Sequence, residues 1–267
     1  MRVVLPEMDD PRVADAAARM RADDLCVPVA LGDVTDAQVA ILMDRRGLKE
    51  PLARRMLGKP LIRAAAMVAA GEADALVAGA DSPTRRVIEA AGIAIGMADG
   101  VETPSSFFLM AFPDREVIFA DCAVTTDPDA GQLADIARAS AASCAALIGP
   151  PKVAMLSFST GTSGAGPSVD KVRAAAEMTG FTGPIQADAA LNATIARKKG
   201  LGDGDANVLI FPSLDAGNIA YKLCQELAGA QAIGPFLQGF ARPVCDLSRG
   251  ASVDDIYAAT AVALAMA

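Results

Sequence analysis

Short apolar runs alternate with longer amphipathic stretches along most of the chain. The short runs predict strands at residues 2–6, 26–31, 74–79, 153–159, 184–188 and 207–212. Between them, alanine-rich segments with helical spacing predict helices, for example at residues 12–22, 59–71 and 128–149. A repeated alternation of strand and helix is typical of parallel sheets that helices cover on both faces. The predicted fold class is therefore α/β.

Residues 105–122 depart from this alternation. Two β-rich runs flank the turn-forming residues Pro113 and Asp114, which predicts an antiparallel hairpin. With so many strands we expect two α/β domains, mainly parallel sheets covered by helices, and an active-site cleft between the domains. The first domain is placed approximately at residues 1–98 plus 253–267, where a C-terminal helix completes it, and the second at residues 99–252.

Composition narrows the possible partners. The net charge of −8 and the pI of about 4.6 argue against nucleic acid or an anionic membrane as a primary partner. No apolar run reaches the length of a membrane span, and the first apolar run is too short for a signal peptide. The five cysteines are widely spaced without a CxxC pair, which favours reduced thiols in a cytoplasmic protein.

The chain contains no histidine. Ser-His-Asp triads, Cys-His dyads and HExxH zinc sites are therefore excluded. Acid–base chemistry must come from Asp, Glu, Lys, Tyr or Cys.

Residues 157–172, SFSTGTSGAGPSVDKV, form the first candidate site. A strand ends near Phe158, a loop of small residues follows, and Pro167 begins a helix. Backbone N–H groups and hydroxyls in such a loop can bind an anion. The pattern is neither a Walker loop nor a dinucleotide fingerprint, and a connection that binds nothing is the alternative.

Residues 81–90, DSPTRRVIEA, form the second candidate site, directly after a predicted strand. Arg85 and Arg86 fall in the first turn of a helix, at the strand end where open α/β sheets bind ligands. Cations at a helix N-terminus oppose its dipole, which favours an anion-binding role. A solvated arginine pair is the alternative.

Two further helix starts carry polar residues. Asp215, Gly217 and Asn218 begin the helix after the strand at residues 207–212, where capping is the simpler interpretation. Near the C-terminus, Ser252 and Asp255 match a capping box, with Ser252 as N-cap. The capping box does not account for Ser248 and Arg249. Because the chain has no histidine, Asp255 at this helix start is also one of the few candidates for a carboxylate base.

These motifs, in this order, resemble those of the phosphate acetyl/butyryl transferase family, specifically the phosphotransacetylases. The similarity runs from VVLPEMDDPRV through GEADALVAGA, SSFFLM, KVAMLSFSTGTSGAGP and ANVLIFPSLDAGNIAYKL to PVCDLSRGASVDDI, and so covers essentially the whole chain. It implies a reversible phosphate acyltransferase, most simply acetyl-CoA + phosphate to acetyl phosphate + CoA. It also implies CoA as a substrate, no cofactor, no metal, and a homodimer.

The resemblance assigns roles to individual residues. It implies that Asp255 takes the proton of the CoA thiol, which attacks acyl phosphate directly in a ternary complex, while Ser248 and Arg249 orient substrate and stabilise negative charge. The implied substrate- or phosphate-binding residues are Arg12, Arg85, Arg86, Ser159, Thr160, Gly161, Thr162, Ser163 and Gly164. Thiol activation by a base and phosphate binding by arginine are sound chemistry.

The sequence departs from the family pattern after residue 80. The family usually has a longer H-[ST]-[ST]-x-D-x-x-R stretch, whereas this chain has DSPTRR, so the phosphate arginine is either Arg85 or Arg86. This difference motivates one alternative, a weak or inactive relative that binds CoA or acyl phosphate in a regulatory role. A phosphate butyryltransferase is the other, since acyl length is not readable from the sequence.

Overall fold

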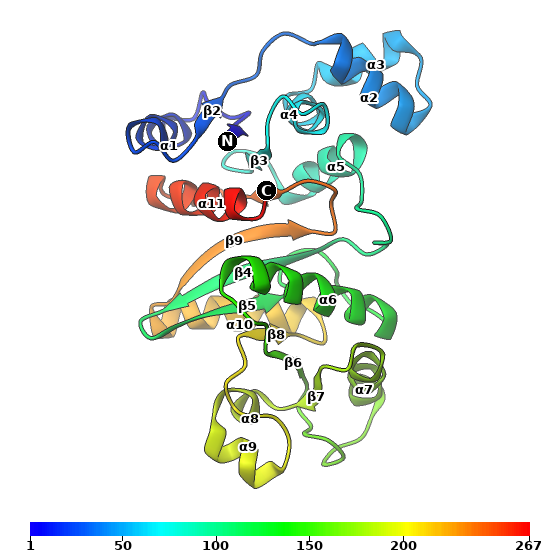
Figure 1. The fold of residues 1–267 in the computed structure, drawn as a ribbon, viewed down its shortest axis with the longest axis vertical. Coiled ribbons are helices and arrows are strands. Elements are labelled where there is room, and N and C mark those ends of the chain that lie inside the picture. The colour runs from blue at the N-terminus through cyan, green and yellow to red at the C-terminus, as the bar shows by residue number, and fades with distance from the viewer. The chain divides into compact units, whose positions relative to one another are not determined.

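The computed structural model describes all 267 residues, which form two compact units (Figure 1). The first unit contains Met1–Gly100 and Phe240–Ala267, and the second contains Val101–Gly239. Residues 240–252, which the sequence interpretation assigns to the second domain, lie in the first unit. They do so because strand β10 (Val244–Asp246) pairs in parallel with β3 (Ala75–Ala78).

The sheet of the first unit has the strand order β2-β1-β3-β10, and all its pairs are parallel. Its other strands are β1 (Arg2–Val4) and β2 (Val27–Val29). Its helices are α1 (Pro11–Ala22), α2 (Asp36–Arg46), α3 (Glu50–Leu57), α4 (Pro60–Ala69), α5 (Thr84–Ala94) and α11 (Val253–Ala265). Helix α11 packs against α1 and β3.

The sheet of the second unit has the order β9-β4-β5-β8-β6-β7. Its strands are β4 (Ser105–Phe112), β5 (Arg115–Ala120), β6 (Val153–Leu156), β7 (Thr182–Ile185), β8 (Val208–Ile210) and β9 (Gln231–Gln238). Strand β4 is antiparallel to β5 and β9, and the remaining pairs are parallel. Its helices are α6 (Ala130–Leu147), α7 (Pro167–Thr179), α8 (Ala187–Leu191), α9 (Ala193–Lys199) and α10 (Leu214–Ala228).

Strands β3, β6 and β8 are buried at every residue, as strands covered on both faces must be. Aromatic residues are few, and several of those in the second unit lie in its core, where the Phe108 ring stacks on Tyr221 with centroids 4.1 Å apart. Small aliphatic side chains fill most of the remaining interior.

The α/β class with mainly parallel sheets is confirmed, and so are the β4–β5 hairpin and the helices that begin at Pro167 and near Arg85. Strands β9 and β10 were not predicted. Strand β9 contains Gly234 and Pro235, and β10 follows Pro243 and ends in the charged residue Asp246, so neither produces a clear run of β-forming residues. None of the helices combines the length and the apolar character needed to cross a membrane.

Candidate active site

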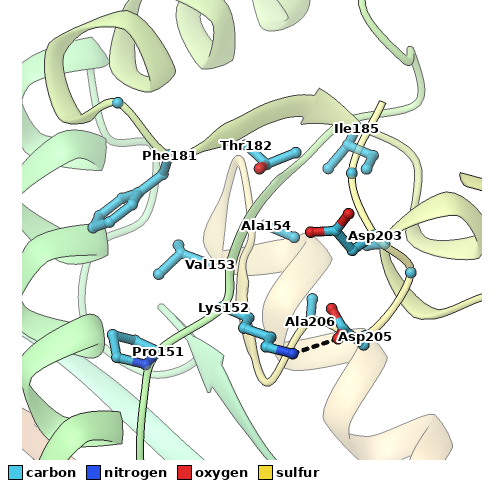
Figure 2. A pocket seen from close by; sticks show the side chains of 14 residues that line it. Pro151, Lys152, Val153, Ala154, Phe181, Thr182, Ile185, Asp203, Asp205 and Ala206 are labelled. Atoms are coloured by element: carbon cyan, nitrogen blue, oxygen red, sulfur yellow. Dashed lines mark hydrogen bonds and ion pairs between the residues drawn. The ribbon is translucent and has the colours of Figure 1, made fainter. Parts of the chain in front are cut away.

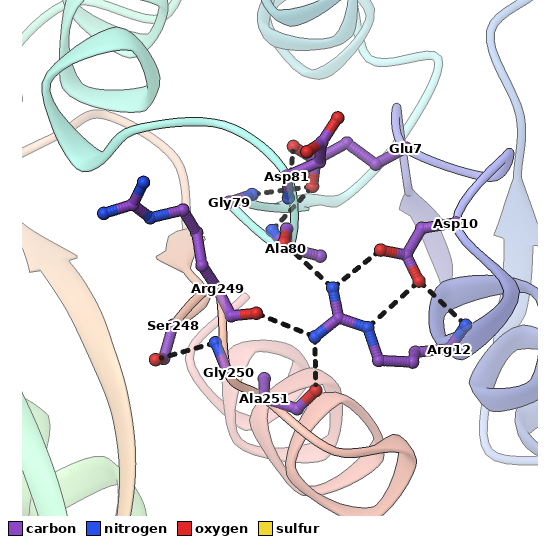
Figure 3. Close-up of polar contacts among 10 residues, drawn as sticks. All are labelled: Glu7, Asp10, Arg12, Gly79, Ala80, Asp81, Ser248, Arg249, Gly250 and Ala251. Carbon is purple, nitrogen blue, oxygen red and sulfur yellow. Dashed lines mark hydrogen bonds and ion pairs between the residues drawn. The ribbon is translucent and has the colours of Figure 1, made fainter.

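The turn between β10 and α11 carries Ser248 and Arg249. Strand pairing continues one residue past β10, because the N–H of Leu247 donates to the Ala78 carbonyl at 2.6 Å. The chain then turns tightly, with the Ala251 N–H donating to the Ser248 carbonyl at 2.9 Å. Both Ser248 and Arg249 are exposed, and the Arg249 guanidinium has no hydrogen-bond or ion-pair partner (Figure 3). A free cation is thus presented at the carboxyl end of a buried strand.

Helix α11 begins with the predicted capping box. The Ser252 hydroxyl accepts from the Asp255 N–H at 3.2 Å, and Asp255 Oδ2 accepts from the Ser252 N–H at 2.9 Å. The Ser252 hydroxyl also donates to the same oxygen, Oδ2, at 2.8 Å. Asp255 Oδ1 has no hydrogen bond, so one oxygen of this half-buried carboxylate remains for a substrate.

The turn after β3 packs against the end of β10. Gly79 has φ +110°, and a Cβ there would lie 2.5 Å from Asp246 Oδ1 and 2.7 Å from the Leu247 carbonyl oxygen. Only glycine fits this conformation and this close approach. The carboxylate of Glu7 fixes the turn, since its Oε2 accepts from the N–H groups of Gly79 and Ala80, both at 2.8 Å (Figure 3).

Arg12 lies between these two turns. Its Nη1 donates to the carbonyl oxygens of Arg249 at 2.8 Å and Ala251 at 2.9 Å, and its Nη2 donates to that of Ala80 at 3.0 Å (Figure 3). Its Nε and Nη2 also donate to the two carboxylate oxygens of Asp10, at 3.1 and 2.6 Å. This pairing holds the pKa of Asp10 below its ordinary value, chiefly through the side-chain hydrogen bonds from Arg12.

Arg85 and Arg86 occupy the first turn of α5, as predicted. Both are exposed and have no ion-pair partner, and both line a cavity of about 580 Å³. Lys59, just before α4, lines the same cavity and is also unpaired. The sequence interpretation did not include Lys59, because it is distant in sequence and belongs to no motif.

Asp246, the last residue of β10, is only 1% exposed, and neither of its carboxylate oxygens accepts a hydrogen bond of standard geometry. Its pKa is raised to about 7, mainly because burial disfavours the charged form. The nearby Thr84 hydroxyl offsets part of this shift, and the charge of Glu7 adds to it. The sequence signal for this group is an Asp that ends a strand, which is too common to single it out.

In the second unit, the loop Ser159–Gly164 follows β6 and is largely bonded to itself. The Ser159 hydroxyl accepts from the Gly164 N–H at 2.8 Å, and the Ser163 hydroxyl accepts from the Thr160 N–H at 3.0 Å. The Thr160 hydroxyl bonds to Gln186, and the Gly161 N–H donates to the Pro184 carbonyl. Only Thr162 keeps both a free N–H and a free hydroxyl, and it is exposed.

A separate cavity of about 230 Å³ lies at the amino ends of β6 and β7 (Figure 2). Its one lysine, Lys152, is paired with Asp205, and Asp203 adds a second acid. The cavity is at the opposite end of β6 from the Ser159–Gly164 loop, and its charge does not favour an anion. The helix start at α10 has the capping role expected of it, although Ser213 is the cap and accepts from the Ala216 N–H.

Comparison with known proteins identifies the family. The profile of the family described as "Phosphate acetyl/butaryl transferase" matches residues 35–264. The chain belongs to this family. A curated phosphate acetyltransferase of Staphylococcus aureus is 37% identical over the whole chain, which covers 94% of that relative. One of Nitrosomonas europaea is 40% identical over 96% of the chain, but the chain spans only 42% of that longer relative.

Solved structures agree with this family. The EutD phosphotransacetylase from Staphylococcus aureus superposes with a TM-score of 0.93 at 36% identity, covering 100% of this chain and 94% of that one. A phosphotransacetylase from Streptococcus pyogenes gives a TM-score of 0.90 at 34% identity, covering 100% and 93%. No group of three or more Cys, Asp or Glu side chains is arranged to hold a metal ion.

Proposed function

We propose that the chain is a phosphate acetyltransferase that catalyses acetyl-CoA + phosphate ⇌ acetyl phosphate + CoA. Family membership and the similarity to curated phosphate acetyltransferases support this reaction class. The observation that carries the proposal is the turn Ser248–Asp255, which presents a free guanidinium and a carboxylate oxygen without a partner.

The proposed chemistry uses Asp255 as the base. Its Oδ1 takes the proton of the CoA thiol, and the thiolate attacks the carbonyl carbon of acetyl phosphate. The bond from that carbon to the phosphate oxygen breaks, and phosphate leaves with the electron pair and can recover the proton from Asp255. Activation is needed because a thiol with a pKa of about 8.5 is mostly protonated at neutral pH.

The negative charges of the reactants suggest a role for each exposed arginine of the site. Negative charge develops on the carbonyl oxygen and on the leaving phosphate, and we assign its stabilisation to Arg249 with Ser248 as a hydroxyl donor. Arg85 and Arg86 are proposed to bind phosphate groups of the substrates, since guanidinium groups bind phosphate in a bidentate manner. In the second unit, Thr162 is the member of the Ser159–Gly164 loop with donors left for an anion.

The decisive assay follows CoA release from acetyl-, propionyl- and butyryl-CoA, with and without phosphate. Phosphate-dependent release that is fastest with acetyl-CoA is expected. Fastest release from butyryl-CoA would identify a butyryltransferase instead. Absence of phosphate-dependent turnover with every acyl-CoA would exclude the proposed activity and leave a binding protein.

We further propose that the protein works in the cytoplasm as a homodimer. None of the five cysteines forms a disulfide bond within the chain, which is compatible with a reducing compartment. On α10, Ile219, Leu223 and Leu227 form an apolar row on one face and are each more than half exposed. Sedimentation equilibrium tests the dimer, and the variant Leu223→Glu/Leu227→Glu is expected to be monomeric if this row is the interface.

A further inference from the structure

All five N–H groups of the Arg12 guanidinium already have acceptors within the protein. Two go to Asp10 and three go to backbone carbonyl oxygens. A guanidinium has no other donor, so a substrate phosphate would have to displace one of these partners. The structure therefore gives Arg12 no free group with which to bind a ligand.

The three carbonyl oxygens belong to two segments that carry proposed functional residues. Ala80 lies in the turn that leads from β3 to Arg85 and Arg86. Arg249 and Ala251 lie on either side of Gly250, between Ser248 and the N-cap of α11. Arg12 is 68 residues from the first segment and 237 to 239 residues from the second, and it connects them through a single planar group.

Arg12 itself is held in place at the start of helix α1. Asp10 is the N-cap of α1 and accepts from the Arg12 N–H at 2.9 Å, while its carboxylate holds the Arg12 guanidinium. Glu7, on the same N-terminal segment, holds the N–H groups of Gly79 and Ala80. By contrast, the Ser248–Ala251 turn has few bonds of its own, namely those from the N–H groups of Gly250 and Ala251 to Ser248.

We propose that Arg12 is a positioning residue, which fixes the Ser248–Ala251 turn against the turn after β3 and does not contact substrate. The proposal rests on the proposed acetyltransferase function for its kinetic test. Carbonyl oxygens on both sides of Gly250 are fixed by one guanidinium, so the direction of the Arg249 side chain and the start of α11 are set together. Loss of Arg12 is expected to displace both.

Steady-state kinetics of Arg12→Ala and Arg12→Lys separate positioning from binding. Displacement of a catalytic group by about 1 Å can cost about 100-fold, so kcat of Arg12→Ala should fall by about that factor with little change in KM for phosphate or acetyl phosphate. Arg12→Lys should recover part of kcat, because an ammonium keeps up to three of the contacts. A raised KM for phosphate with kcat retained would make Arg12 a substrate ligand and overturn the proposal.

Arg63→Ala is the matched control. Arg63 also donates to two backbone carbonyl oxygens of the first unit, those of Leu57 and Gly32, but it joins neither turn. The Arg63→Ala variant should be less stable than the wild type, but its kcat should not fall. An equal fall in kcat for both variants would mean that Arg12 acts only through general stability.

A double-mutant cycle with Arg249→Ala tests the route of action. If Arg12 acts by positioning the turn, Arg12→Ala should reduce kcat much less in the Arg249→Ala background than in the wild type. Strictly additive losses would contradict the proposal.

Hydrogen exchange tests the positioning role of Arg12 independently of turnover. In Arg12→Ala, the amides of residues 79–82 and 248–252 should exchange faster than in the wild type and in Arg63→Ala. Unchanged exchange in both segments would overturn the proposal even if the wild type is an active acetyltransferase. If both segments exchange faster in Arg12→Ala but the wild type has no acyltransferase activity, the positioning role of Arg12 would be supported and only the proposed function would be refuted.

Discussion

Asp255 Oδ2 accepts two hydrogen bonds from Ser252, one from its N–H and one from its hydroxyl, and Oδ1 accepts none. One carboxylate therefore carries a structural role and a proposed chemical role on separate oxygens. The two roles can be tested separately, because an amide oxygen retains the first and loses the second.

Asp255→Asn should keep the helix cap and lose the base. General-base catalysis typically contributes 10²- to 10⁴-fold, so kcat should fall by about that range while the free energy of unfolding changes little. Activity and urea denaturation measured on the same sample check this. Ser252→Ala provides the contrast, with a loss of about 1 kcal/mol of stability from the missing cap. A fully active Asp255→Asn protein would remove Asp255 from the mechanism.

Asp246 should make the protein less stable as the pH rises. Its pKa is about 7 in the folded protein against an ordinary value of 3.8, so the folded state binds a proton that the unfolded state has lost. The stabilisation from this proton is complete below about pH 4 and is lost as the pH rises through about 7. A shift of this size corresponds to roughly 4 kcal/mol.

Asp246→Asn should remove most of this pH dependence. Compared with the wild type, the variant should gain more free energy of unfolding at pH 8 than at pH 5, as measured by urea denaturation at both pH values. Equal gains at the two pH values would show that Asp246 is charged in the folded protein throughout this range.

Arg85→Ala and Arg86→Ala should weaken binding of phosphate-bearing substrates. A hydrogen bond to a charged group contributes about 1.5–3 kcal/mol, so KM for at least one substrate should rise by about 10-fold or more for the arginine that binds it. Arg197→Ala, on α9 of the second unit, serves as a control for loss of one positive charge. Unchanged KM values in the double variant Arg85→Ala/Arg86→Ala would assign the cavity another role.

Gly79→Ala should be far more damaging than Gly71→Ala. Both glycines have positive φ, +110° and +73°, but only at Gly79 would a Cβ collide with neighbouring atoms, Asp246 and Leu247. Backbone strain alone costs about 1–3 kcal/mol, which sets the expected loss for Gly71→Ala. Thermal unfolding compares the two variants, and equal shifts in Tm would show that the contact with β10 is easily relaxed.

The sequence predicted the elements with strong local patterns. The apolar strands, the hairpin at Pro113 and Asp114, and the capping box at Ser252 and Asp255 were all recognisable because each depends on residues within a few positions. Strand β10 has no such pattern, because it ends in a charged residue, Asp246, which is buried only where the strand pairs with β3, far away in the sequence.

The sequence predicts which residues gather at the candidate site, but not which hydrogen-bond partners they have there. Arg12 matched a family motif, and the expectation was a substrate contact, because a motif cannot reveal that backbone carbonyl oxygens occupy the guanidinium. In the same way, the hydroxyl-rich sequence at Ser159 and Thr160 predicts free hydroxyl groups, whereas in the folded protein the Ser159 hydroxyl bonds within the loop and the Thr160 hydroxyl bonds to Gln186. Hydrogen bonds between side chains and distant main-chain atoms carry no sequence pattern.

The pairing of β3 with β10 also affects the order in which the chain folds during synthesis. Residues 101–239 form a unit that is continuous in sequence, so this unit can fold as soon as it leaves the ribosome. The first unit, although it is synthesised earlier, has an unpaired β3 edge until residues 244–246 emerge. Of the two units, the one that contains the earlier-made residues is therefore completed last, and until then its unpaired strand edge is open to pairing with other chains.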